Sequence, residues 1–215
     1  MHIPDGIIPV QAALGGYVAA GGAAWLTLVK IRRKYKNPRE AIPRASLLTA
    51  VFFAASLVHI PLPPTSVHLV LSGLVGVILG WFAFPAILVG LFFQAVMFQH
   101  GGLTTLGVNA CLIGLPALLS GALFQLRRYF GRNRAVPNAL LAFGGGFLAV
   151  AVGAFSAALL LTYTIPAHLD AAAERAAIIA LSLAHLPVAL LEGVFTALVV
   201  LFLLRVKPEL LELEA

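Results

Sequence analysis

The first two residues, Met1 and His2, form a possible metal chelate at the chain terminus. The α-amine of Met1, the deprotonated backbone nitrogen of His2 and the His2 imidazole can bind one ion together and close two chelate rings. Such a set is planar and made only of nitrogen, which suits Ni²⁺ and Cu²⁺ better than Zn²⁺. The chelate requires Met1 to be retained with a free amine. The alternative interpretation is that His2 is an ordinary polar residue before a helix.

Two later histidines are candidates for a fourth nitrogen ligand. His68, in the segment PPTSVHL, follows the pair Pro63 and Pro64 and is expected at the start of a membrane helix, where it can point over the terminal chelate. His59 lies nine residues earlier and competes for the same role. For either residue the alternative is a histidine at the membrane interface that binds no metal.

The segment QHGGLTTLGVN, residues 99–109, is a second group of polar residues. Its paired glycines permit a sharp turn with close backbone approach, and its threonines can cap the helix that follows. We expect four side chains of this region to line the metal pocket or to support its ligands: Gln94, His100, Thr104 and Asn109. An equally acceptable interpretation is a hairpin turn with ordinary hydrogen bonds between helices.

Glu192 lies near the middle of the last apolar segment, where an ionisable side chain is costly and is treated as functional by default. His185, Glu192 and Thr196 have spacings of seven and four residues and therefore share one helix face. We expect this face to point into the bundle, with His185 and Glu192 near the pocket. The alternative for Glu192 is a structural role, as a protonated side chain bonded to Asn109 or Gln94.

These side chains must be positioned by membrane helices. The 215-residue chain is 61% hydrophobic and only 10% charged, with a mean hydropathy of +1.01, whereas soluble domains are about one quarter charged. A helix that crosses the bilayer needs about 20 apolar residues. The sequence predicts an all-α membrane protein with seven transmembrane helices in one domain, residues 1–215. The seven segments are 11–31, 45–62, 67–80, 84–99, 105–126, 138–164 and 178–204.

Basic residues decide the predicted orientation. Every Lys and Arg except Arg175 falls in the first loop, in the fifth loop or after the last segment. By the positive-inside rule these stretches are cytoplasmic, so the N-terminus is expected outside and the C-terminus inside. The histidines of the proposed pocket then lie on the outer side. The net charge of +6 is explained by topology and anionic lipid, and no nucleic-acid partner is expected.

The segments MHIPDG, SVHL, HGGLTTLGVN and HLPVALLEGVFTAL occur together and in one order. In this the chain resembles the membrane substrate-capture subunit of the nickel and cobalt energy-coupling-factor transporters, over nearly its whole length. The resemblance implies a seven-helix bundle in which the N-terminal segment, residues 1–10, is inserted into an outer metal pocket. It also places metal ligands on Met1, His2 and His68, and it matches no ligand motif to His59.

The resemblance further implies ATP-driven uptake across the plasma membrane of a prokaryote, with a transmembrane coupling subunit, cytoplasmic ATPases and often a small accessory membrane subunit. The chain lacks a Walker-type phosphate loop, so ATP hydrolysis is assigned to partners. Helix faces with spaced alanines, such as Ala50 and Ala54, are expected to contact the coupling subunit. The leading function is capture of Ni²⁺ or Co²⁺ in a square-planar nitrogen site, with nickel favoured. The alternatives are an intramembrane metalloenzyme and a capture subunit for an organic vitamin.

Overall fold

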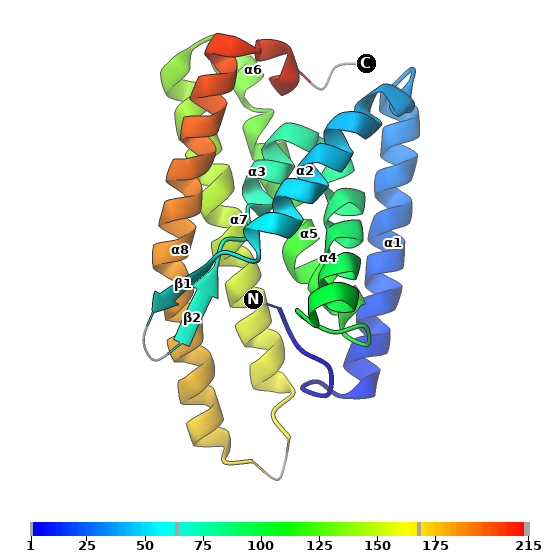
Figure 1. The fold of residues 1–215 in the computed structure, drawn as a ribbon, viewed down its shortest axis with the longest axis vertical. Helices are drawn as coiled ribbons and strands as arrows, with labels where there is room; N and C mark the ends of the chain where they lie inside the picture. The colour runs from blue at the N-terminus through cyan, green and yellow to red at the C-terminus, as the bar shows by residue number, and fades with distance from the viewer. Residues whose placement is uncertain (1, 63–64, 167–168, 213–215) are drawn as a thin grey trace.

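The computed structural model describes residues 2–62, 65–166 and 169–212. Its helices run mostly along one long axis, with α2 slanting across the front and a short strand pair beside α8 (Figure 1). The elements in chain order are α1 (Val10–Lys34), η1 (Pro38–Ala41), α2 (Ile42–Ala55), β1 (His59–Leu62), β2 (Thr65–His68), α3 (Ser72–Leu79), η2 (Gly80–Phe82), α4 (Ala83–Phe98), α5 (Leu106–Phe124), α6 (Arg127–Phe130), α7 (Ala135–Tyr163), α8 (Ala171–Val206) and η3 (Pro208–Leu211).

The helical architecture predicted from the sequence is confirmed, and the chain is a multi-pass membrane protein. Within the described residues, five helical stretches are long and apolar enough to cross a membrane. One of them, Ser72–Phe98, is long enough only because α3, η2 and α4 follow one another without a break, although the chain reverses between α3 and α4. The helix α2 is shorter than these stretches, with 14 residues. Each of the seven predicted segments contains one helix, but the count of seven spans and the orientation of the termini stay predictions.

Two of the predicted segments were wrong at one end. The second was extended to Leu62 and the third was begun at Val67, but residues 59–62 and 65–68 form an antiparallel strand pair in which His59 lies opposite His68. The reason is the run of prolines at positions 61, 63 and 64, because proline cannot continue a helix. His68 is therefore the last residue of β2 and does not begin a helix. The residue before α3 is Leu71, in a left-handed conformation with φ of 54°.

Glycines allow the central helices to pack with their backbones in contact. A Cβ atom added to Gly76 of α3 would lie 1.9 Å from the carbonyl oxygen of Ala117 in α5, and one added to Gly73 would lie 2.5 Å from the Cα of Gly146 in α7. Such approaches exclude any larger residue. The crossing of α3 with α5 and α7 places α3 in the middle of the bundle, where all of its residues are buried.

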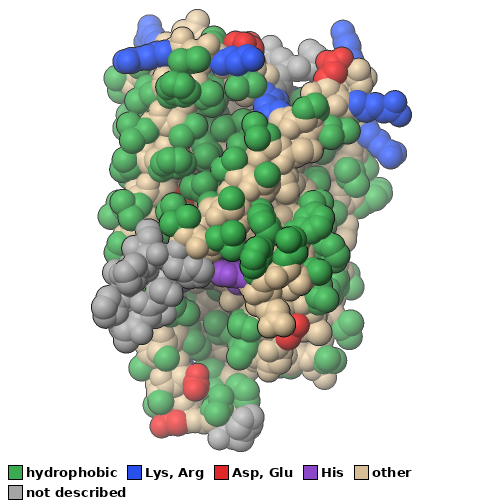
Figure 2. Space-filling model, in the orientation of Figure 1, with side chains coloured by type: hydrophobic (Ala, Val, Ile, Leu, Met, Phe, Trp, Pro, Cys, Tyr) green, Lys and Arg blue, Asp and Glu red, His purple; other side chains and the backbone are tan. Residues whose placement is uncertain are grey.

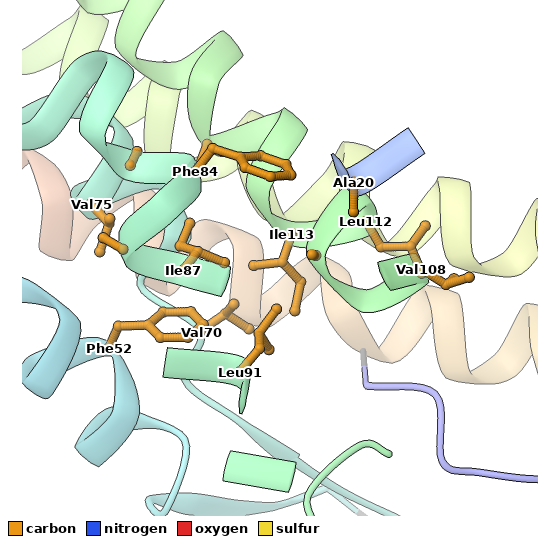
Figure 3. Close-up of a cluster of buried hydrophobic side chains, with 14 of the residues drawn as sticks. Ala20, Phe52, Val70, Val75, Phe84, Ile87, Leu91, Val108, Leu112 and Ile113 are labelled. Atoms are coloured by element: carbon orange, nitrogen blue, oxygen red, sulfur yellow. The ribbon is translucent and has the colours of Figure 1, made fainter. Parts of the chain in front are cut away.

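The apolar core lies between α2, α3, α4 and α5. Figure 3 shows Phe84, Ile87 and Leu91 of α4 directed toward Ile113 of α5, with Phe52 of α2 close by. These side chains are at most 2% exposed. The core fixes α4 against α5, and the ends of these two helices carry the residues of the site described below.

The two ends of the bundle differ in charge. Lys and Arg side chains gather at the upper end, where α1 ends and α6 and η3 lie, whereas the lower half of the face in view shows acidic side chains and a histidine (Figure 2). The N-terminal segment, residues 2–9, runs from the interior of the bundle to the lower end of α1 (Figure 1). The described part of the chain therefore begins near mid-height in this view, below the basic end.

Candidate metal centre

His2, His68 and His100 come from three distant parts of the sequence and meet inside the bundle. His2 Nδ1 lies 3.2 Å from His68 Nε2, and His100 Nε2 lies 3.1 Å from the same atom. One ring nitrogen of each residue lies within 4.8 Å of the others. Adjacent nitrogens bound about 2.0 Å from one ion lie about 2.8 Å apart. The observed spacing is therefore close to that required for a shared metal ion.

A hydrogen bond of His68 decides which of its ring nitrogens can bind a metal ion. His68 Nδ1 lies 3.1 Å from the carbonyl oxygen of Leu69, and a carbonyl can only accept, so Nδ1 carries the proton and Nε2 carries the lone pair. Metal-binding histidines commonly donate their second nitrogen in this way. The His100 ring is nearly perpendicular to the rings of His2 and His68, with interplanar angles of 89° and 84°.

The side chain of Asn109 in α5 holds the backbone next to His2. The Ile3 backbone N–H donates to Asn109 Oδ1 at 2.9 Å, and Asn109 Nδ2 donates to the Ile3 carbonyl at 3.0 Å. The hydroxyl of Thr105 donates to the same carbonyl at 2.6 Å. The Ile3 side chain is only 2% exposed, so this peptide has lost its water and depends on these bonds. They fix where His2 lies.

Asp5 provides a second attachment for the N-terminal segment. Its carboxylate accepts from the hydroxyl of Thr104 at 2.5 Å and from the backbone N–H groups of Leu103, Thr104 and Thr105. The Thr104 hydroxyl, more than the N–H groups, lowers the pKa of Asp5. A Cβ on Gly102 would lie 1.9 Å from Asp5 Oδ1, so the turn before α5 requires glycine there, as predicted from the sequence.

Glu192 of α8 holds the backbone that follows His68. Its carboxylate accepts from the backbone N–H groups of Val70 and Leu71, with both oxygens 2.9 Å from the Leu71 nitrogen. Glu192 is fully buried. The predicted alternative, in which Glu192 bonds to Asn109 or Gln94, is wrong, because Glu192 accepts at the start of α3, where N–H groups lack helical partners. Glu192 therefore positions His68 through the main chain.

His100 is positioned by the end of α4. Its backbone N–H donates to the carbonyl oxygen of Gln94 at 3.1 Å, and Gln99 before it is left-handed with φ of 52°. His68 lies before α3 and His100 lies after α4, yet their rings touch. The chain therefore doubles back between α3 and α4 at η2, where Gly80 has φ of 53°. This reversal brings the two histidines together.

Gln94 lies buried next to the ring of His2. His2 Nε2 and both amide atoms of Gln94 are buried, and no hydrogen-bond partner is found for them among the described residues. Burial lowers the pKa of His2 well below its usual value, and the neighbouring Gln94 amide has a smaller, opposite effect. The imidazole is thus kept neutral, which is the form that binds metal. When Nδ1 of His2 binds an ion, Nε2 carries the proton and can donate it to the Gln94 amide oxygen. This bond would satisfy both groups that have no partner among the described residues.

The remaining predicted residues have different outcomes. Met1 and the side chain of His59 lie outside the described residues. His185 is buried in α8 and lines a cavity of about 200 Å³ together with His2, but it is not within ligand distance of the three histidines. Ala50 lines an apolar groove of about 530 Å³ between α2 and α4, and Ala54 is exposed.

Sequence reasoning missed the two anchors of the N-terminal segment, namely Asp5 and the Ile3 peptide. A signal for Asp5 existed, because Asp is a preferred capping residue and the turn before α5 was recognised as needing caps. Nothing in the sequence, however, shows that a cap comes from a residue almost a hundred positions away. The Ile3 peptide has no signal at all, since backbone groups are the same at every position.

The chain is similar to known metal transport proteins over nearly its full length. A relative from Haemophilus influenzae, whose name assigns it to metal transport, is 33% identical over 213 residues, which are 98% of this chain and 97% of that protein. The cobalt transport protein CbiM of Sorangium cellulosum is 30% identical over 223 residues, covering 99% and 95%. A crystal structure of a transition metal transporter has the same fold, with a TM-score of 0.81 and 24% identity over 96% of this chain and 93% of that one.

The sequence profile of one family covers almost all the described elements, from His2 to Leu210. This range contains the three clustered histidines and the residues that hold them in place. The chain therefore belongs to the CbiM family, the cobalt uptake substrate-specific transmembrane region.

Proposed function

We propose that this chain captures Ni²⁺ or Co²⁺ at the cluster of His2, His68 and His100 and passes the ion inward with partner subunits. Family membership makes the chain a transporter component and not an enzyme. The single observation that carries the proposal is that one ring nitrogen from each of the three histidines lies within 4.8 Å of the others. The backbone next to His2 is held there by two hydrogen bonds with Asn109. Imidazole nitrogen suits both metals.

The ligand set that we propose is the Met1 amine, the His2 backbone nitrogen, His2 Nδ1 and His68 Nε2. In such a terminal chelate Nδ1 is the imidazole nitrogen that closes the second ring with the backbone nitrogen. Nδ1 is also the His2 atom that lies 3.2 Å from His68 Nε2. The pairing of these two atoms supports a four-nitrogen plane, provided that Met1 has a free amine.

His100 was expected to line the pocket, and its ring contacts suggest a more direct role. Its Nε2 lies 3.1 Å from His68 Nε2, and its ring stands nearly perpendicular to those of His2 and His68. We propose that His100 offers a fifth nitrogen above the plane. A purely planar site favours Ni²⁺, whereas an axial imidazole removes part of that preference. The cobalt names of the relatives agree with such a relaxed choice.

The proposed partners are a transmembrane coupling subunit, cytoplasmic ATPases and a small accessory membrane subunit. The basic end of the bundle, with α6 and η3, is assigned to the cytoplasm by the positive-inside rule, which leaves the histidine cluster nearer the outer face. The apolar groove that contains Ala50 is the proposed contact surface for the coupling subunit. ATP-driven movement of that subunit would then release the ion inward.

The test is a one-residue extension of the N-terminus. An added alanine before Met1 moves the amine away from the His2 backbone nitrogen, so the terminal chelate cannot close, while no helix is altered. We expect tight nickel binding to be lost in titration calorimetry with an unchanged melting temperature of the metal-free protein. Intact mass spectrometry must show that the unextended protein keeps an unmodified Met1. Equal nickel affinity in the extended protein would exclude the terminal amine as a ligand.

Substitution of single histidines separates the ligands from their neighbours. We expect His68→Ala to abolish tight binding and His59→Ala, the matched control on the opposite strand, to leave it unchanged. His100→Ala should retain nickel binding and weaken cobalt binding more strongly, because a planar nickel site needs no fifth ligand. Equal losses for both metals would make His100 a member of the main ligand set.

A further inference from the structure

Two adjoining cavities lead from the outer end of the α7–α8 pair to His2. The inner one, about 200 Å³, lies between the N-terminal segment and these helices and is lined by His2, Ser182 and His185. The outer one, about 300 Å³, is lined by Thr164 and Glu174 near the ends of the same helices. The two cavities share lining residues Ile7, Leu161 and Ile178. The shared residues place the two cavities next to each other along α8, with the inner one reaching His2 of the histidine cluster; we call the pair the hollow along α8.

Small residues of α7 create the inner space. Ala154, Ala157 and Ala158 face the N-terminal segment across the cavity. At about 30 Å³ for each water molecule, 200 Å³ holds roughly six of them. A partly hydrated divalent ion therefore fits.

The opposite wall is formed by α8, where the polar residues Ser182 and His185 stand among apolar ones. Glu174, Ser182 and His185 follow one another with spacings of eight and three residues, which places them along the same side of the helix. Glu174 lies at the outer cavity and His185 at the inner one, beside His2. The other described residues lining the inner cavity are mostly apolar. A divalent ion in such surroundings needs a protein or water ligand at every step, because an unpaired buried charge is costly.

His185 is arranged as a metal ligand. Its Nδ1 lies 2.8 Å from the carbonyl oxygen of Leu181, one turn earlier in α8. Because a carbonyl only accepts, Nδ1 carries the proton and Nε2 the lone pair. Metal-binding histidines are oriented by this kind of bond to a backbone carbonyl. His185 is only 6% exposed, so its ring has little conformational freedom.

We propose that the hollow along α8 is the access route of the divalent ion, and that His185 binds the ion in transit and hands it to His2. The proposal rests on the proposed function of the histidine cluster. On this view His185 is not part of the final ligand set, because it lies outside the group of nitrogens within 4.8 Å of one another. His185 lowers the free-energy barrier for movement of the ion from the outer cavity to the histidine cluster. Glu174 contributes negative charge at the outer cavity, which favours the approach of cations.

A ligand that acts only in transit changes rates and leaves affinity alone. We expect His185→Ala, in the full-length chain in nanodiscs, to slow nickel association by about tenfold or more, which is about 1.4 kcal/mol on the barrier. Dissociation should slow by the same factor, so that the equilibrium dissociation constant stays unchanged. Association is measured by stopped-flow mixing with NiCl₂, and dissociation by transfer to a chromogenic chelator.

Filling the cavity gives a second, independent variant. Ala158→Leu places a larger side chain in the inner cavity and should also slow association and dissociation equally. Ala180→Leu is the matched control, because Ala180 is exposed on α8 and lines neither cavity, and it should leave both rates unchanged.

Two results would overturn the access route. Unchanged rates in both His185→Ala and Ala158→Leu would mean that the ion enters elsewhere. A weaker affinity of His185→Ala caused only by faster dissociation would make His185 a ligand or a support of the final site. Failure of the proposed function itself is a different result, since the unmodified protein would then bind no nickel in the same assay.

Discussion

Replacement of Asn109 by Leu tests whether docking of the N-terminal segment is coupled to metal binding. The substitution keeps a side chain of similar size but removes both hydrogen bonds to Ile3. The Ile3 carbonyl retains its bond from Thr105, whereas the Ile3 N–H is left buried without a partner. An unsatisfied buried donor costs about 1–3 kcal/mol. At about 1.4 kcal/mol for each tenfold change, nickel affinity should fall by about 5- to 140-fold.

The measurement is calorimetric titration with NiCl₂ together with thermal unfolding of the metal-free protein. We expect the melting temperature to change little, because the N-terminal segment can detach locally without unfolding the helices. Asn138→Leu is a matched control. Asn138 is also a fully buried asparagine, but it bonds to carbonyl oxygens near α6, at the basic end. This variant should lower the melting temperature and leave nickel affinity intact. Unchanged affinity in a folded Asn109→Leu protein would refute the coupling.

Four further predictions concern the residues that support the ligands and the protons that the ligands must release. Glu192→Gln should weaken nickel binding by about tenfold, about 1.4 kcal/mol, because one of the two oxygens near the Leu71 N–H becomes an NH₂ group, which donates and cannot accept. Thr196→Val, one turn away and without a hydrogen-bond partner among the described residues, is the control for this titration. Gln94→Leu should weaken nickel binding similarly, since His2 Nε2 then has no acceptor nearby, and an affinity equal to wild type would show that Gln94 only fills space. Burial keeps the pKa of His2 below its usual value. Below about pH 6.5 the histidine of the unfolded chain therefore takes up a proton that folded His2 does not. The free energy of unfolding of the metal-free protein should fall as the pH falls. Nickel affinity should also fall between about pH 7.5 and 5.5, by more than one proton per ion, because the amine and imidazole ligands must be deprotonated; a slope near zero would indicate oxygen ligands.

Apolar segments and their boundaries made most of the helices predictable. The basic loops and the glycine pair before α5 were also predicted, because each depends on its own neighbours in sequence. The strand pair β1–β2 was missed because residues 59–62 and 67–68 were assigned to the ends of two predicted spans. The prolines at 61, 63 and 64 were the signal against helix.

The site was less predictable than the helices. His2 and His68 were expected to meet from motifs, and the structure brings them together. The split between segments 67–80 and 84–99 predicted the reversal that puts His68 and His100 on the same side of the bundle, but it did not predict that their rings touch. Hydrophobic patterns place whole segments and leave the contacts between individual side chains open. The bonding partner of Glu192 was predicted wrongly for a related reason. Polar side chains were sought as partners, and the actual partners are backbone N–H groups that any sequence would supply.

Each histidine of the cluster is held through its main chain by a different helix. Asn109 of α5 bonds the peptide next to His2, Glu192 of α8 bonds the peptides after His68, and the carbonyl of Gln94 in α4 accepts from the N–H of His100. Hydrogen bonds of 2.9–3.1 Å weaken strongly once a helix moves by about 1 Å. A shift of α8 relative to α4 and α5 would therefore move His68 away from the other two rings without altering any ligand. The geometry of the cluster depends on the relative positions of three helices, so a partner that displaces one of them can change metal affinity from a distance.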